Sequence, residues 1–252
     1  MKIISVFNQK GGVGKTTTVV NLSAALGRKK KKVLVIDLDP QGNTTSGLGV
    51  DKDEVDNTIY DVLLSATTAD VAITDTASKN VYLIPSNNDL SGFEIEAVSK
   101  DQRESLLTKV LSDLEGYDFV LIDCPPSLGL LSINALVSSN SVIIPIQSEY
   151  YALEGVSQLV QTIDLVKRSL NKDLEVEGVV ISMFDGRNNL SLEVVEEVKK
   201  YFKDKVYKSI IPRNIRLAEA PSYGMSVIDY DEKSKGAVAY LNLAKELIKQ
   251  NR

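Results

Sequence analysis

Residues 8–17, Asn-Gln-Lys-Gly-Gly-Val-Gly-Lys-Thr-Thr, constrain the fold of this chain more than any other stretch. The apolar run at 3–7 before them is typical of a buried strand, and residues 16–28 carry apolar side chains at helical spacing. Glycines between a strand and a helix let backbone N–H groups approach phosphate oxygens, and a helix N-terminus favours negative charge. We therefore predict a phosphate-binding loop that comprises Lys10, Gly11, Gly12, Val13, Gly14, Lys15, Thr16 and Thr17.

Two side chains of this loop have expected roles. Lys15 should reach the β- and γ-phosphates of a nucleotide, and the hydroxyl of Thr16 should bind Mg²⁺. A plain glycine-rich turn would explain the glycines, but it would not explain Gly-Lys-Thr directly after a strand. The loop therefore indicates that the chain binds ATP or GTP. It also departs from the standard pattern, because Gln9 stands at the first glycine position and Lys10 adds a second lysine.

Acidic residues follow two further predicted strands, at 33–37 and 119–123. Ligands bind at the carboxyl ends of parallel strands, so Asp39 should lie near the phosphates. Asp123 ends an apolar strand, as does the acid that holds a water molecule of the Mg²⁺ shell in phosphate-loop enzymes. Asp37, two residues before Asp39, is expected to have a structural role.

Strands and helices alternate at least six times, which predicts a mainly parallel, twisted α/β sheet with helices on both faces. With 252 residues, 43% of them hydrophobic, the chain can form one sizeable domain, and we expect that domain to span 1–252. Further strands are expected at 81–85, 142–146, 179–184 and 206–211, and helices at 59–64, 130–137, 153–170 and 236–250, the last with Val238 facing inward. Residues 90–114 should be irregularly helical and 44–56 a mobile loop, while Ser191 should cap the helix after it.

Composition excludes several classes of protein. The chain has no histidine, which rules out histidine-based triads and histidine metal sites. A single cysteine, Cys124, allows no internal disulfide and favours a reducing, cytoplasmic setting. We expect no signal peptide, because the first strand begins at once, and no membrane span, because no apolar stretch approaches 18 residues.

Charge is unevenly distributed along the sequence. Residues 1–185 hold 16 Lys and Arg against 25 Asp and Glu, a net −9, whereas residues 186–252 hold 13 against 9, a net +4. A basic final quarter on an acidic protein is compatible with a local DNA-binding surface, and equally with ordinary solvated helix faces.

The loop from Lys10 to Thr16 resembles the deviant Walker A loop of the ParA/MinD ATPases, which are P-loop NTPases. In that family the first lysine reaches the partner's ATP across a nucleotide-sandwich dimer, and Lys10 matches its position. The resemblance also implies that Asp39 orients the attacking water and the Mg²⁺ shell, and that Asp123 is the Walker B acid. Lys10, Lys15 and Asp39 are thus the expected catalytic residues, and Thr16, Asp39 and Asp123 the expected metal-site residues.

Residues 212–221, Pro-Arg-Asn-Ile-Arg-Leu-Ala-Glu-Ala-Pro, resemble a motif of the ParA subgroup. Its first three residues surround the adenine, and they match Pro212, Arg213 and Asn214. The resemblance covers nearly the whole chain and implies a Soj-like DNA-partitioning ATPase. Arg187 and Arg216 match arginines that contact DNA in the resembling bacterial proteins.

Such ATPases are implied to form homodimers around ATP and Mg²⁺ and to bind nonspecific double-stranded DNA. A ParB-type centromere-binding protein stimulates hydrolysis and thereby release. The expected location is the cytoplasm, at the nucleoid. Whether the cargo is a chromosome or a plasmid stays open.

Two other functions remain possible from the sequence. A MinD-like ATPase would bind membranes through an extra basic amphipathic helix, but here only 250–252 are left beyond the part of the last helix expected to pack on the core. A nucleotide-gated DNA-binding switch with negligible turnover would share the same motifs, and an ATPase assay with DNA and the partner would distinguish it.

Overall fold

Seven strands form one sheet in this computed structural model, which describes residues 1–149 and 152–251, without the side chains of 152–154. The spatial order is β3-β4-β2-β5-β1-β6-β7, and every pairing is parallel except that of β3 with β4. The strands are β1 (Lys2–Val6), β2 (Val33–Asp37), β3 (Thr74–Asp75), β4 (Val81–Ile84), β5 (Phe119–Asp123), β6 (Ser141–Gln147) and β7 (Glu175–Ser182). The predicted parallel α/β fold is confirmed.

Alternating side chains of the central strands enter two separate hydrophobic clusters, one on each face of the sheet. In β2, for example, Val33 and Val35 belong to one cluster, and Leu34 and Ile36 belong to the other. All four are fully buried. A strand buried on both faces needs a continuous apolar run, which is why these strands were recognisable in the sequence.

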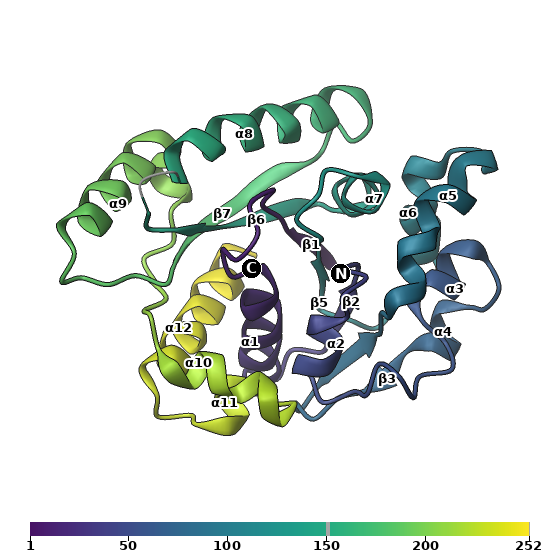
Figure 1. Cartoon of the computed structure of the whole chain (residues 1–252), viewed down its shortest axis with the longest axis horizontal. Helices are drawn as coiled ribbons and strands as arrows, with labels where there is room; N and C mark the ends of the chain where they lie inside the picture. The colour runs from purple at the N-terminus through teal and green to yellow at the C-terminus, as the bar shows by residue number, and fades with distance from the viewer. Residues whose placement is uncertain (150–151, 252) are drawn as a thin grey trace.

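Helices cover both faces, as Figure 1 shows. They are α1 (Lys15–Arg28), α2 (Asn43–Gly47), α3 (Ile59–Leu64), α4 (Ala69–Ala72), α5 (Phe93–Glu96), α6 (Leu106–Ser112), α7 (Leu130–Ser138), α8 (Ala152–Ser169), α9 (Asn189–Phe202), α10 (Ile215–Glu219), α11 (Val227–Tyr230) and α12 (Lys235–Gln250). On one face α1 and α12 lie side by side, and Tyr240 of α12 approaches Thr18 of α1 with 3.3 Å between their hydroxyl oxygens. The last helix is therefore part of the core. In the described part of the chain no helix combines the length and the apolar character that crossing a membrane requires.

The seventh strand predicted at 206–211 is wrong. This segment forms no continuous ladder with β7: it makes isolated bridges, Val179 to Val206 and, beyond the strand, Phe184 to Pro212. The N–H groups of Tyr207 and Ile211 also donate to the carbonyls of Val179 and Ile181, at 3.0 and 2.8 Å. Between them the N–H groups of Lys208 and Ser209 donate to the Glu246 carboxylate of α12, at 2.9 and 2.8 Å, instead of joining a ladder. The seventh strand is instead the two-residue β3, which the sequence analysis missed.

Three local predictions also need correction. Residues 44–56 are not wholly a mobile loop, because α2 continues to Gly47 and buries Thr44 and Thr45 fully. The cap of α9 is Asn188, whose side chain accepts from the N–H of Leu190, whereas Ser191 is buried inside the first turn. Val238 faces outward and is 47% exposed.

Candidate nucleotide and magnesium site

The carboxyl ends of β1, β2 and β5 lie next to one another at one edge of the sheet. The register pairs Asp123 with Val6 of β1 on one side and with Asp37 of β2 on the other. The loop after β1, the turn after β2 and the end of β5 therefore meet at one place, as the sequence predicted. Parallel sheets bind ligands at this kind of edge.

The predicted phosphate loop has the backbone that its glycines allow. Gly12 and Gly14 have φ of 73° and 92°, and the Gly14 conformation leads directly into the N-terminus of α1. A Cβ added to Gly11 or Gly12 would meet nothing within 4 Å, so the loop exposes its backbone there. The hydroxyl of Ser182, at the end of β7, donates to the carbonyl of Val13 at 2.7 Å. This hydrogen bond attaches the loop to the sheet.

Lys15 lies across this loop and is only 7% exposed. Its Nζ donates to the carbonyl of Lys10 at 3.1 Å. Burial lowers the pKa of Lys15 from its ordinary value, and the nearby Asp123 carboxylate opposes that shift. A cation held in so little water is suited to bind an anion that enters the loop.

Asp123 is fully buried and accepts two hydroxyl hydrogen bonds on Oδ2, from Thr16 at 2.7 Å and from Thr44 at 2.6 Å. Its other oxygen, Oδ1, has no hydrogen-bond partner among the described residues. Burial raises the pKa of Asp123 above its ordinary value, and the two hydroxyls counteract this. A buried carboxylate oxygen without a donor is an oxygen ligand available to Mg²⁺ or to its water shell.

Asp39 differs from Asp37 in exposure. Asp39 lies partly open to solvent, and its Oδ1 accepts from the N–H of Gln41 at 3.0 Å. Asp37 is fully buried, and burial together with the Asp123 charge raises its pKa above the ordinary value. No group of three acidic or cysteine side chains suited to a metal exists within the described residues. The residues fit Mg²⁺ only as an ion that also takes oxygens from phosphate and water.

The predicted adenine residues line a separate cavity of about 260 Å³ beside the phosphate loop. Pro212, Arg213 and Asn214 form one wall, and Gly14 and Thr17 form another. Six further lining residues were not predicted as site residues, because nothing in their local pattern marks them: Ser182, Met183, Ile211, Leu217, Ala218 and Tyr240. Asn214 also caps α10 by accepting from the N–H of Arg216 at 3.1 Å, which fixes the backbone at the cavity wall.

Lys10 is one of the exposed residues of the loop. Its ammonium lies 3.7 Å from the Glu149 carboxylate, and the two side chains are 41% and 52% exposed. An ion pair this open and this long contributes little to stability. Lys10 is thus free to exchange Glu149 for another anionic partner.

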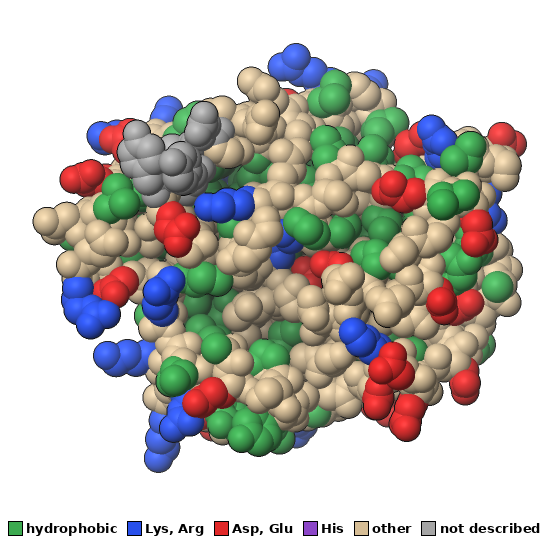
Figure 2. Space-filling view, viewed as in Figure 1, with side chains coloured by type: hydrophobic (Ala, Val, Ile, Leu, Met, Phe, Trp, Pro, Cys, Tyr) green, Lys and Arg blue, Asp and Glu red, His purple; other side chains and the backbone are tan. Residues whose placement is uncertain are grey.

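The two arginines predicted to bind DNA are not among the residues that line the cavity beside the phosphate loop, and both have acidic neighbours. Arg187 is 91% exposed and pairs with Asp185 at 2.7 Å, while Arg216 pairs with Glu219 at 2.8 Å. Figure 2 shows Lys and Arg side chains gathered toward the lower left of the molecule, over α9 and α10, with more acidic side chains on the right. On this face, basic side chains thus gather over helices that belong to the basic final quarter of the sequence.

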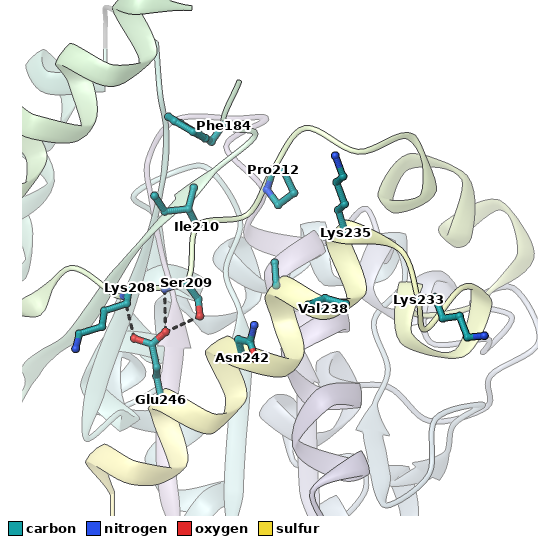
Figure 3. A pocket seen from close by; sticks show the side chains of 11 residues that line it. Phe184, Lys208, Ser209, Ile210, Pro212, Lys233, Lys235, Val238, Asn242 and Glu246 are labelled. Atoms are coloured by element: carbon teal, nitrogen blue, oxygen red, sulfur yellow. Dashed lines mark hydrogen bonds between the residues drawn. The ribbon is translucent and has the colours of Figure 1, made fainter. Parts of the chain in front are cut away.

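A wider groove of about 650 Å³ lies between the segment at 208–212 and α12. Figure 3 shows Val238, Ile210 and Pro212 along it, with the Lys208, Lys233 and Lys235 side chains spreading outward instead of converging. Pro212 is shared with the 260 Å³ cavity, but no residue of the phosphate loop lines this groove. The groove is therefore distinct from the candidate nucleotide site.

Known proteins are similar to this chain over its whole length. Residues 1–176 match the family described as "AAA domain". The sporulation initiation inhibitor protein Soj of Bacillus subtilis (strain 168) is 55% identical over 247 residues, which span 98% of this chain and 98% of that protein. The chain belongs to the ParA/Soj family.

Other comparisons agree with ParA/Soj membership. The chromosome partitioning protein ParA of Myxococcus xanthus (strain DK1622) is 51% identical over 251 residues, 99% of this chain and 89% of that one. A solved structure named cobyrinic acid a,c-diamide synthase, from Mycobacterium smegmatis with bound ATP analogue and magnesium, matches with a TM-score of 0.90 at 37% identity. The match covers 100% of this chain and 96% of that one. The predicted family and fold are thereby confirmed.

Proposed function

We propose that this chain, residues 1–252, is a single ATPase domain that binds ATP with Mg²⁺ and drives DNA partitioning. The observation that carries the proposal is the meeting of the phosphate loop, Asp39 and Asp123 at one edge of the sheet. The ParA/Soj family membership supports partitioning as the process, and the ATP analogue and magnesium in the similar solved structure support the ligands.

In the proposed site, Lys15 and the N–H groups of the loop bind the β- and γ-phosphates, and Pro212, Arg213 and Asn214 enclose the adenine. Thr16 would hold Mg²⁺, and Asp39 and Asp123 would hold its water shell. The ion neutralises charge on the phosphates when bound. Transfer of a phosphoryl group requires mainly positioning and charge neutralisation, so the absence of histidine from the sequence is no obstacle.

Hydrolysis in this proposal is attack of a water oxygen on the γ-phosphorus while the bond to the β–γ bridging oxygen breaks. The products are ADP and inorganic phosphate, and the proton of the water leaves with the phosphate or to solvent. Asp39 accepts a hydrogen bond from the attacking water and directs it. Lys10 of each protomer contacts the ATP of the other, a role that its exposure and weak ion pair with Glu149 allow.

ATP-dependent dimerisation would also control DNA binding. One protomer offers few side chains to the DNA phosphates, and a dimer doubles them. Hydrolysis, stimulated by a ParB-type partner, would return the protein to monomers that leave the DNA. The proposed location is the nucleoid in the cytoplasm.

DNA binding with ATP, ADP or no nucleotide tests this proposal. With ATP, we expect sequence-independent binding that weakens with salt, with a log–log slope of about −0.9 per phosphate neutralised. The double variant Arg187→Ala, Arg216→Ala should bind more weakly, and each arginine removed from each protomer should flatten the slope by roughly one unit. Fluorescence anisotropy with a labelled duplex at several salt concentrations measures both quantities.

Arg103→Ala is the matched control, because Arg103 also forms a surface ion pair, with Glu104 at 3.2 Å. Arg103 lies just before α6, which lies on the opposite side of the molecule from α9 in Figure 1. This control variant should leave the slope unchanged. The double variant should still bind ATP and dimerise. If it binds DNA as the unaltered protein does, the DNA surface lies elsewhere. A protein that binds DNA with ATP but shows no turnover with DNA and partner would instead be a nucleotide-gated switch.

The MinD-like alternative makes a different prediction. Because α12 packs on α1, it is not available as a separate membrane helix. We expect no flotation with anionic liposomes in the presence of ATP. ATP-dependent flotation that disappears when the last ten residues are removed would favour the membrane function.

A further inference from the structure

The main chain of Asp39 is held from both sides by buried side chains. Its N–H donates to Oδ1 of Asp37 at 3.1 Å, and its carbonyl accepts from the hydroxyl of Ser86 at 2.9 Å. Asp37 and Ser86 are both fully buried, whereas Asp39 itself is partly exposed. The backbone groups of a surface turn can bond water instead, so two buried side-chain partners restrain this turn more than exposure requires.

Thr45 connects Asp37 and Ser86 through hydrogen bonds. Its hydroxyl donates to Oδ2 of Asp37 at 2.8 Å and accepts from the N–H of Ser86 at 3.0 Å, and its own N–H donates to the same Asp37 oxygen at 2.8 Å. The hydrogen bonds therefore form a closed circuit through the end of β2, the start of α2 and the residue that follows Pro85 after β4. A circuit of buried hydrogen bonds holds its members more rigidly than the separate bonds would.

The turn after Asp39 also packs against Ser86. Gly42 has a φ of 62°, and its N–H donates to the Asp39 carbonyl at 2.9 Å. A Cβ at this position would lie 2.8 Å from the backbone oxygen of Ser86. The turn at Gly42 therefore packs so closely against the backbone of Ser86 that no side chain would fit between them. This packing restricts movement of Asp39.

We propose that Asp37, Thr45 and Ser86 are positioning residues that fix the main chain of Asp39 and so direct its carboxylate at the attacking water. This inference rests on the proposed role of Asp39 in hydrolysis. None of the three touches the phosphate loop through a hydrogen bond among the described residues. Their loss should therefore slow the chemical step and spare ATP binding.

The test compares Thr45→Val with Thr45→Ser. Valine keeps the shape of threonine and loses the hydroxyl, whereas serine keeps the hydroxyl. Removing a residue that orients a reactive group typically lowers activity about 10- to 100-fold, so we expect Thr45→Val to reduce kcat for ATP hydrolysis by about tenfold. KM and the dissociation constant for ATP should stay within about twofold of the unaltered values, and Thr45→Ser should retain most of the rate.

Ser86→Ala is the second variant, needed because Thr45→Val leaves the buried Ser86 N–H without its acceptor and could impair folding. It removes only the hydrogen bond to the Asp39 carbonyl and should also lower kcat severalfold. Its matched control is Ser23→Ala, since Ser23 is equally buried but bonds only within α1, to the carbonyl of Val20. The control should hydrolyse ATP normally.

A readout independent of activity is amide hydrogen exchange in the peptide covering 37–42 without nucleotide. It should become faster in Thr45→Val and Ser86→Ala and stay unchanged in Ser23→Ala, because protection reports how tightly the turn is held. Normal kcat in folded Thr45→Val and Ser86→Ala would overturn the positioning role. Loss of kcat together with an equal loss of ATP affinity would also overturn it, since that indicates general damage. An Asp39→Ala protein that hydrolyses ATP normally would instead contradict the proposed function.

Discussion

Replacing Lys15 by alanine should abolish tight ATP binding. Lys15 is the buried cation of the phosphate loop, and no other lysine of the loop is turned inward in the same way. Hydrogen bonds to charged groups contribute about 1.5–3 kcal/mol each, so removing those to two phosphates should weaken binding by roughly 100-fold or more. Titration with ATP and Mg²⁺ in a calorimeter measures the change.

The fold should tolerate this substitution. Burial lowers the pKa of Lys15 even though the Asp123 carboxylate nearby opposes the shift, which means that this position disfavours a cation when no phosphate is bound. Lys15→Ala should therefore unfold at the same temperature as the unaltered protein, or above it, when no nucleotide is present. If Lys15→Ala binds ATP tightly, the phosphates do not bind where we propose.

Lys10→Ala is the natural companion to this variant, because both lysines belong to one loop but only Lys15 is buried. It should bind ATP with nearly unaltered affinity and lose ATP-dependent dimerisation and stimulated hydrolysis. Normal dimerisation and turnover of Lys10→Ala would exclude a role across the dimer.

The second large effect is expected for Asp39→Ala, which should bind ATP and fail to hydrolyse it. Groups that orient or accept protons from a reacting water typically contribute about 10²- to 10⁴-fold to the rate. The variant should accumulate as a persistent ATP dimer, visible by size-exclusion chromatography with ATP and Mg²⁺. Asp173→Ala, an exposed acid just before the start of β7 and hence at the other end of the strands, is the control. An Asp39→Ala protein that binds ATP but stays monomeric would exclude the trapped dimer.

The sequence predicted those parts of the site that depend on local pattern. Gly12, Gly14 and Lys15 stand at a fixed spacing between a strand and a helix, and Asp123 ends a strand that is apolar throughout. Strand order then brings these segments together without further information, because parallel strands present their carboxyl ends at one edge. The loop and the two acids were therefore predictable as a group.

What escaped prediction depends on contacts between distant segments. Thr44 and Thr45 looked like part of a polar loop, yet their hydroxyls bond buried carboxylates of β5 and β2. The run at 206–211 has the composition of a strand, but Glu246 of α12 takes two of its N–H groups. Strand propensity describes a segment alone, whereas here hydrogen bonds to Glu246, far along the chain, determine the conformation of 206–211.

The order of strands also determines when the molecule can first function. β1 is synthesised before the other strands of this sheet, but its neighbours β5 and β6 end only at Asp123 and Gln147. The helix after the phosphate loop packs against α12, which ends at Gln250. Contacts between residues so far apart in sequence form late. A nascent or prematurely terminated chain therefore contains the complete loop sequence but lacks the strands and the helix against which the loop region packs. Under the proposed function, we therefore expect unfinished chains neither to bind nucleotide nor to form dimers with finished ones.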